Sequence, residues 1–257
     1  MIGRGKVDSI LKYNAIGFDM DHTFVRYKLR NFIKLIYDCT AIFLVSRKNY
    51  PQEIFPIDEE DAKAKYRMFF RAVFDHKTGN LLKIGSNGLI MRAFHGFRML
   101  PREEILATYG KNPVVPDYQI LSHRHKDFTN LHEFYGAAQV PLIAQLVELA
   151  SKGKLPEVNY YKFIADIFES NEFNFGIPDV ALFEQKHYTG NFFPKFLSEP
   201  RHYINKNRQQ LMQSLKALQE KQIPVFIVSN SYFSVANIIM TEAVGPNWLD
   251  FFDFVIY

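Results

Sequence analysis

The chain has 257 residues, a formal net charge of +4 and one cysteine, Cys39, so no internal disulfide can form. Hydrophobic residues make up 47% and charged residues 23%, which is typical of a globular protein with one core and an insertion, or with two modest domains. The basic residues are scattered and no apolar run approaches the roughly 20 residues of a membrane span, so we expect a cytoplasmic protein that binds neither nucleic acid nor membrane.

The first predicted element is an apolar strand over 15–19 that ends in two closely spaced aspartates, Asp19 and Asp21. In an open α/β sheet the ligand crevice lies beyond the carboxyl ends of the strands. A carboxylate there can attack phosphorus, the second can handle the leaving-group proton, and Asp19 with the backbone at Asp21 can hold Mg2+. A calcium loop would need Gly and Glu where this chain has Phe24 and Arg30. A plain turn with solvated aspartates is the remaining alternative.

Helices are predicted through much of the following stretch. Apolar residues recur at helical spacing over 31–46, which puts Cys39 on the buried side as a core thiol rather than a nucleophile. Further helices are expected at 58–70, 137–150 and 160–168. The stretch 101–131 is polar and poorly periodic, and residues 171–205, interrupted by prolines, are predicted to be loop.

Two short motifs interrupt this helical stretch. Apolar runs on both sides of an Asn-Gly turn predict a β-hairpin over 80–94. His123 and His125 have the spacing that opens some binuclear metal sites, but Phe128 stands where a further histidine would be needed. A solvated basic loop is the favoured interpretation of these histidines.

The last part of the sequence has the pattern of a doubly wound sheet. A helix marked by Leu211, Leu215 and Leu218 precedes a strand over 223–228, and a helix follows around 235–239. Three polar residues lie at the end of that strand: Ser229, Asn230 and Ser231. A hydroxyl and backbone amides entering a helix can hold phosphate oxygens, although a helix N-cap explains the same residues equally well.

The motif Asp19 to Thr23 (DMDHT), the segments 79–83 and 92–96, and Val228 to Ser231 (VSNS) together resemble the cytosolic purine 5'-nucleotidase family of the haloacid dehalogenase superfamily. The resemblance implies an α/β fold: a three-layer Rossmann-like core with a parallel sheet, carrying a large, mostly helical cap. We expect the core at 1–30 and 206–257, and the cap, including the hairpin, at 31–205.

The same resemblance implies a Mg2+-dependent phosphohydrolase that acts on nucleoside 5'-monophosphates, or another small phosphate ester, through an aspartyl-phosphate intermediate. It makes Asp19 and Asp21 catalytic and metal-binding, and it assigns phosphate binding to Ser229, Asn230 and Ser231.

The sequence departs from the family pattern in two places. Family members continue with a lysine and a Gly-Asp motif, whereas Asp250 and Asp253 are the only aspartates after Ser231 here. We therefore expect that the carboxy-terminal part of the core is missing and that catalysis is impaired. Purine-specific relatives read the base with an arginine and an aspartate of a cap helix, but residues 151–200 contain no arginine. The alternative function is a non-catalytic binding or regulatory protein on a degenerate fold, with a homo-oligomer left open.

Overall fold

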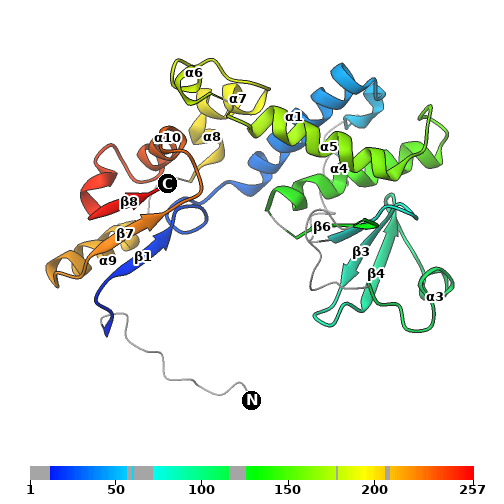
Figure 1. Ribbon diagram of the computed structural model, residues 1–257, viewed down its shortest axis with the longest axis horizontal. Coiled ribbons are helices and arrows are strands. Elements are labelled where there is room, and N and C mark those ends of the chain that lie inside the picture. The colour runs from blue at the N-terminus through cyan, green and yellow to red at the C-terminus, as the bar shows by residue number, and fades with distance from the viewer. Residues whose placement is uncertain are drawn as a thin grey trace. The chain divides into compact units, whose positions relative to one another are not determined.

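A computed structural model describes residues 12–56, 60, 72–115, 126–132, 134–177, 179–205 and 209–257 (Figure 1). The chain divides into two compact units. The parallel-sheet unit comprises residues 12–32, 184–186 and 194–257, and the antiparallel-sheet unit comprises Ile33–Phe183 and His187–Phe193. Among the residues that the structure describes, no helix is both long and apolar enough to cross a membrane.

The parallel-sheet unit is built on three short strands in the order β1-β7-β8 (Figure 1). They are β1 (Ile16–Asp19), β7 (Val225–Val228) and β8 (Phe254–Ile256), and both pairings are parallel. Helix α9 (Gln209–Glu220) leads into β7, and α10 (Phe233–Ala243) with the 3-10 helix η4 (Trp248–Phe251) connects β7 to β8. The expected α/β class with a parallel sheet is therefore confirmed, and so are the strand and helices predicted around Ser229.

The antiparallel-sheet unit contains a five-stranded sheet in the order β5-β4-β3-β2-β6. Its strands are β2 (Ala72–Asp75), β3 (Asn80–Ile84), β4 (Ile90–His95), β5 (Arg98–Met99) and β6 (Phe128–Leu131). Only the hairpin of β3 and β4 is evident from the sequence, because β2 is buried at every position and shows no alternation. The poorly periodic stretch 101–131 also contains α3 (Arg102–Tyr109) and β6.

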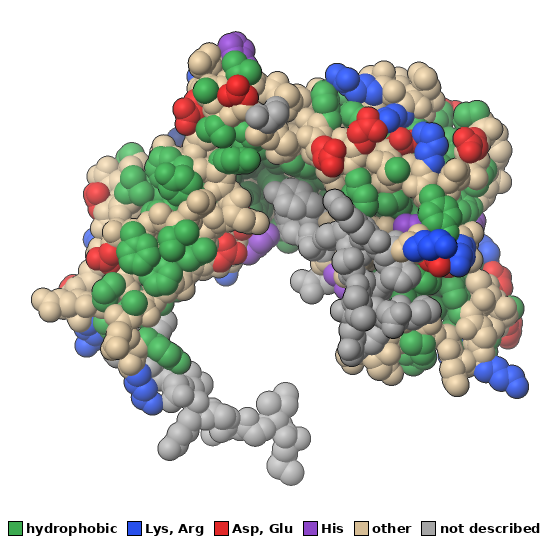
Figure 2. Space-filling model, in the orientation of Figure 1, with side chains coloured by type: hydrophobic (Ala, Val, Ile, Leu, Met, Phe, Trp, Pro, Cys, Tyr) green, Lys and Arg blue, Asp and Glu red, His purple; other side chains and the backbone are tan. Residues whose placement is uncertain are grey.

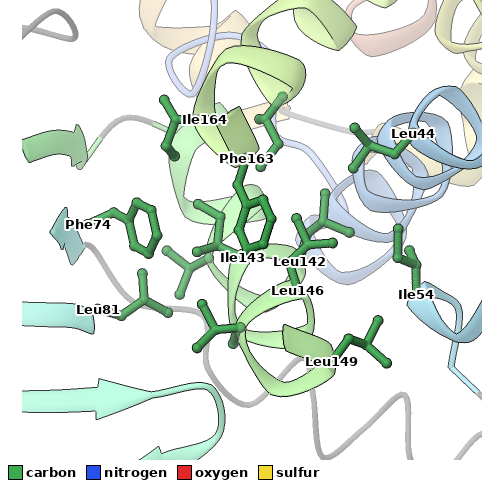
Figure 3. Close-up of a cluster of buried hydrophobic side chains, with 14 of the residues drawn as sticks. Leu44, Ile54, Phe74, Leu81, Leu142, Ile143, Leu146, Leu149, Phe163 and Ile164 are labelled. Carbon is green, nitrogen blue, oxygen red and sulfur yellow. The ribbon is translucent and has the colours of Figure 1, made fainter. Parts of the chain in front are cut away.

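Helices pack against this sheet around one buried cluster (Figure 3). They are α1 (Leu29–Lys48), α4 (Phe134–Ser151) and α5 (Tyr160–Phe175), with the 3-10 helix η2 (Gln52–Ile54). Ile143 and Leu146 of α4 belong to the same buried cluster as Phe74 of the sheet and Phe163 of α5. Because α4 is apolar on all sides, it is buried as a core helix, as its sequence predicts. Cys39 is fully buried in α1, which confirms the core-thiol interpretation.

The loop predicted for 171–205 is wrong, because α5 extends to Phe175 and three short helices follow it. They are α6 (Val180–Glu184), α7 (Phe192–Ser198) and α8 (Pro200–Tyr203). Their aromatic side chains pack against neighbouring rings, as in the edge-to-face pair of Phe183 and Phe193 with centroids 4.9 Å apart. Such tertiary contacts stabilise helices too short to form alone, and Pro200 suits the first turn of α8. The helix predicted over 58–70 and the histidine motif of His123 and His125 lie outside the described residues, apart from Glu60.

Candidate active site

The two polar motifs lie at the same end of the parallel sheet. Asp19, the last residue of β1, pairs in register with Val228, the last residue of β7. Adjacent strands lie about 4.8 Å apart. Ser229 directly follows Val228, so it stands one residue beyond the end of the strand that neighbours Asp19. The structure therefore brings together the ends of the two strands on which the sequence places Asp19 and Ser229.

Asp19 presents an exposed carboxylate at the strand end. Its Oδ1 accepts a hydrogen bond from the backbone N–H of Met20 at 2.7 Å. Its Oδ2 accepts no hydrogen bond from any residue that the structure describes. One oxygen is thus held by the backbone while the other is open to an incoming ligand.

A tight turn follows Asp19 and folds the chain back. The carbonyl oxygen of Met20 accepts hydrogen bonds from the N–H groups of Thr23, Phe24 and Val25 at 3.3, 2.9 and 3.1 Å. His22 has a φ of 57°, a left-handed conformation that helps to close the turn. Phe24 and Val25 are fully buried and anchor it. Because of this turn, the side chain of Tyr27 lies next to that of Asp21.

Asp21 is half-buried, and its Oδ1 accepts a hydrogen bond from the hydroxyl of Tyr27 at 2.5 Å. Burial raises the pKa of Asp21 above its ordinary value, and the nearby Asp19 carboxylate raises it further, while the Tyr27 hydrogen bond and His22 act in the opposite direction. A carboxyl that holds its proton at higher pH is suited to act as a general acid. The spacing of the first motif does not reveal Tyr27, which reaches Asp21 only through the turn.

The second motif combines an oriented hydroxyl with the start of a helix. Ser229 is 7% exposed, and its backbone N–H donates to the carbonyl of Ile256 at 2.9 Å. Its Oγ accepts from the N–H of Ser231 at 3.1 Å, which fixes the turn between strand and helix. Asn230 is exposed, and α10 begins nearby without a side-chain cap or an acidic residue in its first turn. A helix start of this kind favours a bound anion.

The late acids do not join this site. The carboxylate of Asp253 accepts a hydrogen bond from the backbone N–H of Val225 at 2.7 Å, at the opposite end of β7 from Ser229. Asp250 is exposed in η4. Asp253 therefore stabilises the start of β7 rather than serving the strand ends that carry Asp19 and Ser229.

No three His, Cys, Asp or Glu side chains gather in a potential metal site within the part of the chain that the structure describes. Mg2+ does not need such a set, because it is commonly held by one or two carboxylates with water and substrate oxygens. The carboxylate of Asp19 and the backbone carbonyl of Asp21 supply oxygen ligands of the right kind. These residues fit a Mg2+ ion held in part by its substrate.

A second polar cluster lies in the antiparallel-sheet unit, on α5. Asp166 is 5% exposed and forms ion pairs with Lys162 and Lys48, and it accepts a hydrogen bond from the hydroxyl of Tyr50 at 2.9 Å. Lys162, Lys48 and Tyr50 line a small cavity of about 90 Å3 next to Phe163. Helical spacing of four residues between Lys162 and Asp166 is the sequence signal for this pair.

Comparison with known proteins assigns the family. A model described as the 5' nucleotidase family matches residues 9–257. The chain is 26% identical over 253 residues to the human protein 5'-nucleotidase domain-containing protein 1 and 24% identical over 253 residues to its bovine counterpart, covering 96% of this chain and 53% of each relative. It is 25% identical over 255 residues to human 5'-nucleotidase domain-containing protein 2, covering 96% of this chain and 45% of that protein. The chain thus spans about half the length of these relatives. The match over nearly all of its residues shows that the chain belongs to the 5' nucleotidase family.

Proposed function

We propose that this protein is a Mg2+-dependent phosphohydrolase of nucleoside 5'-monophosphates, acting through an aspartyl-phosphate intermediate. The observation that carries the proposal is the parallel pairing of Asp19 with Val228, which sets a carboxylate beside the phosphate-binding motif. Membership of the 5' nucleotidase family supports a nucleoside monophosphate as the substrate. We assign residues 1–30 and 206–257 to a haloacid dehalogenase-type core and residues 31–205 to its cap.

The first half of the reaction transfers the phosphoryl group to the protein. The open Oδ2 of Asp19 forms a bond to phosphorus as the bond from phosphorus to the ribose 5' oxygen breaks. Asp21 gives its proton to that departing oxygen, which leaves as an alcohol. In the second half, Asp21 takes a proton from a water molecule as its oxygen forms a bond to phosphorus. The bond between phosphorus and Asp19 breaks, which releases inorganic phosphate and regenerates the Asp19 carboxylate.

Binding of the phosphoryl oxygens falls to the second motif. The hydroxyls of Ser229 and Ser231, the Asn230 amide and the backbone amides at the start of α10 are hydrogen-bonding groups at the strand end. A Mg2+ ion, held by the Asp19 carboxylate and the backbone carbonyl of Asp21, would supply positive charge to the phosphoryl oxygens.

The experiment that tests the function is Asp19→Asn, assayed by phosphate release from a panel of nucleoside monophosphates with Mg2+. Because the variant lacks the nucleophile, we expect at least a roughly thousandfold loss of turnover. Asp250→Asn is the matched control, since this exposed carboxylate lies outside the site and its loss should leave activity unchanged. Retained turnover in Asp19→Asn would refute the nucleophile assignment.

A second candidate function, a non-catalytic binding protein, is favoured by one observation. Phe226 and Val228 of β7 share a face of the sheet with their partners Phe254 and Ile256 of β8. Val228, Phe254 and Ile256 are 45%, 48% and 48% exposed, and Figure 2 shows hydrophobic side chains gathered over the region of β7. Exposed apolar faces of this kind often mark interaction surfaces. A protein that sediments as a monomer at all concentrations, captures no partner and hydrolyses phosphate esters would contradict this function.

A further inference from the structure

We propose that Tyr27 is a positioning residue for Asp21, which it orients so that one defined carboxyl oxygen carries the proton destined for the leaving group. The inference rests on the proposed phosphohydrolase function. Its basis is the hydrogen bond from the Tyr27 hydroxyl to Oδ1 of Asp21 at 2.5 Å, a length typical of a hydroxyl donating to a carboxyl oxygen.

This hydrogen bond distinguishes the two oxygens of Asp21. The hydroxyl hydrogen of Tyr27 points at Oδ1, so Oδ1 is already occupied as an acceptor. Oδ2 accepts no hydrogen bond from the described residues. A proton on the acid therefore resides on Oδ2, the oxygen that remains available to a substrate.

The tyrosine ring is itself firmly held. It packs against Phe32 and His22 with ring centroids 4.5 and 5.5 Å apart, and Phe196 lies at 6.5 Å. Phe32 and Phe196 are 2% and 1% exposed, so these contacts are inside the unit. A hydroxyl on such a fixed ring can impose an orientation on its partner instead of following it.

The backbone on both sides of Tyr27 is also fixed, by residues far away in the sequence. The N–H of Lys28 donates to the carbonyl of Tyr203 at 2.7 Å, and the N–H of Asn205 donates to the carbonyl of Arg26 at 2.8 Å. Tyr27 itself forms an isolated bridge with Ile204. The segment after α8 thus supports the residue that orients Asp21, which gives it a defined role in the site.

The effect of removing the Tyr27 hydroxyl should depend on the leaving group of the substrate. A ribose 5' alcohol is a poor leaving group and needs a proton from a well-placed acid, whereas 4-nitrophenolate departs without one. Removal of the Tyr27 hydroxyl should therefore slow hydrolysis of alkyl phosphates and spare hydrolysis of aryl phosphates. A purely structural contribution of Tyr27 would lower both rates together.

The test compares the full chain with its Tyr27→Phe variant on a nucleoside monophosphate and on 4-nitrophenyl phosphate, with Asp21→Asn as the reference for loss of the acid. For Tyr27→Phe we expect kcat to fall about 10- to 100-fold on the nucleotide and less than about threefold on the aryl ester, with KM unchanged. A general acid contributes roughly 100-fold or more to the rate, and the loss expected on the nucleotide is a part of that contribution. Tyr203→Phe is the control, because its ring also packs on Phe196 and it should show no dependence on leaving group.

The possible outcomes separate failure of the positioning role of Tyr27 from failure of the proposed function. Equal losses on the two esters, or no loss, in Tyr27→Phe would overturn the positioning role while leaving the proposed function intact, provided that Asp21→Asn shows the leaving-group pattern. If the wild-type chain hydrolyses neither ester, the proposed function fails and the role of Tyr27 fails with it. The melting temperature of each variant shows whether a loss reflects unfolding.

Discussion

Asp19 and Val228 end neighbouring parallel strands at the same level, as residues paired in register. The residues that follow them, Met20 and Ser229, therefore leave the sheet side by side, although more than two hundred positions separate them in the sequence. This single pairing turns two short motifs into one candidate site. The predictions below test this site and the stability of each of the two units.

Ser229→Ala should weaken the binding of phosphate. The Ser229 hydroxyl accepts from the N–H of Ser231 and lies at the strand end, where it can donate its own hydrogen to an anion. Loss of one such hydrogen bond costs about 1 kcal/mol, so we expect inhibition by inorganic phosphate to weaken about five- to tenfold. The control is Ser198→Ala, because the Ser198 hydroxyl is on the surface and donates to the carbonyl of Lys195. Unchanged inhibition in Ser229→Ala would remove this residue from the phosphate site.

Gly17→Ala should destabilise the parallel-sheet unit. A Cβ at this position would lie 2.5 Å from the ring of Phe226, and that ring is stacked on Phe254 with centroids 4.7 Å apart. The ring must move to make room, which costs about 1 to 3 kcal/mol.

Trp248, the only tryptophan and 1% exposed in this unit, provides the measurement through its fluorescence during denaturation. Gly85→Ala is the control, because its nearest contact would be the flexible side chain of Asn87 at 3.2 Å. A Gly17→Ala variant as stable as the wild type would show that Phe226 is not confined in this way.

Asp166→Asn should destabilise the antiparallel-sheet unit by about 2 kcal/mol at neutral pH, because the buried carboxylate loses its charge-assisted contacts with Lys162 and Lys48. Burial alone raises the pKa of Asp166, but the hydrogen bonds and charges of Lys162, Tyr50 and Lys48 outweigh burial and hold the pKa below its ordinary value.

The sign of the pH dependence follows from that lowered pKa. The folded state binds a proton at Asp166 less readily than the unfolded state, so this carboxylate contributes stability above about pH 4 that is lost as the pH falls through the folded pKa. Denaturant midpoints of wild type and Asp166→Asn should therefore converge in acid. Glu103→Gln, at an exposed position of α3, should show no such convergence.

Regular spacing made the long elements of the fold predictable. The helices α1, α4 and α5 follow from recurring apolar residues, and the hairpin of β3 and β4 follows from its Asn-Gly turn. The short strands β2 and β6 and the helices α6 to α8 do not follow from spacing, because four to seven residues carry too little periodicity. Their formation depends on pairing and ring packing with residues distant in the chain.

For the candidate site, the sequence by itself determined which residues stand at the ends of strands: Asp19 and Asp21 after one apolar run, and Ser229 to Ser231 after another. Local hydrophobic pattern is sufficient for that, since a buried strand and its polar end are adjacent in sequence. Only the tertiary structure decided the register of β1 against β7 and that Tyr27 donates to Asp21. The physical reason is that strand register and a side-chain hydrogen bond across a turn depend on how buried residues such as Phe24 and Phe196 pack, and packing is a property of the whole fold.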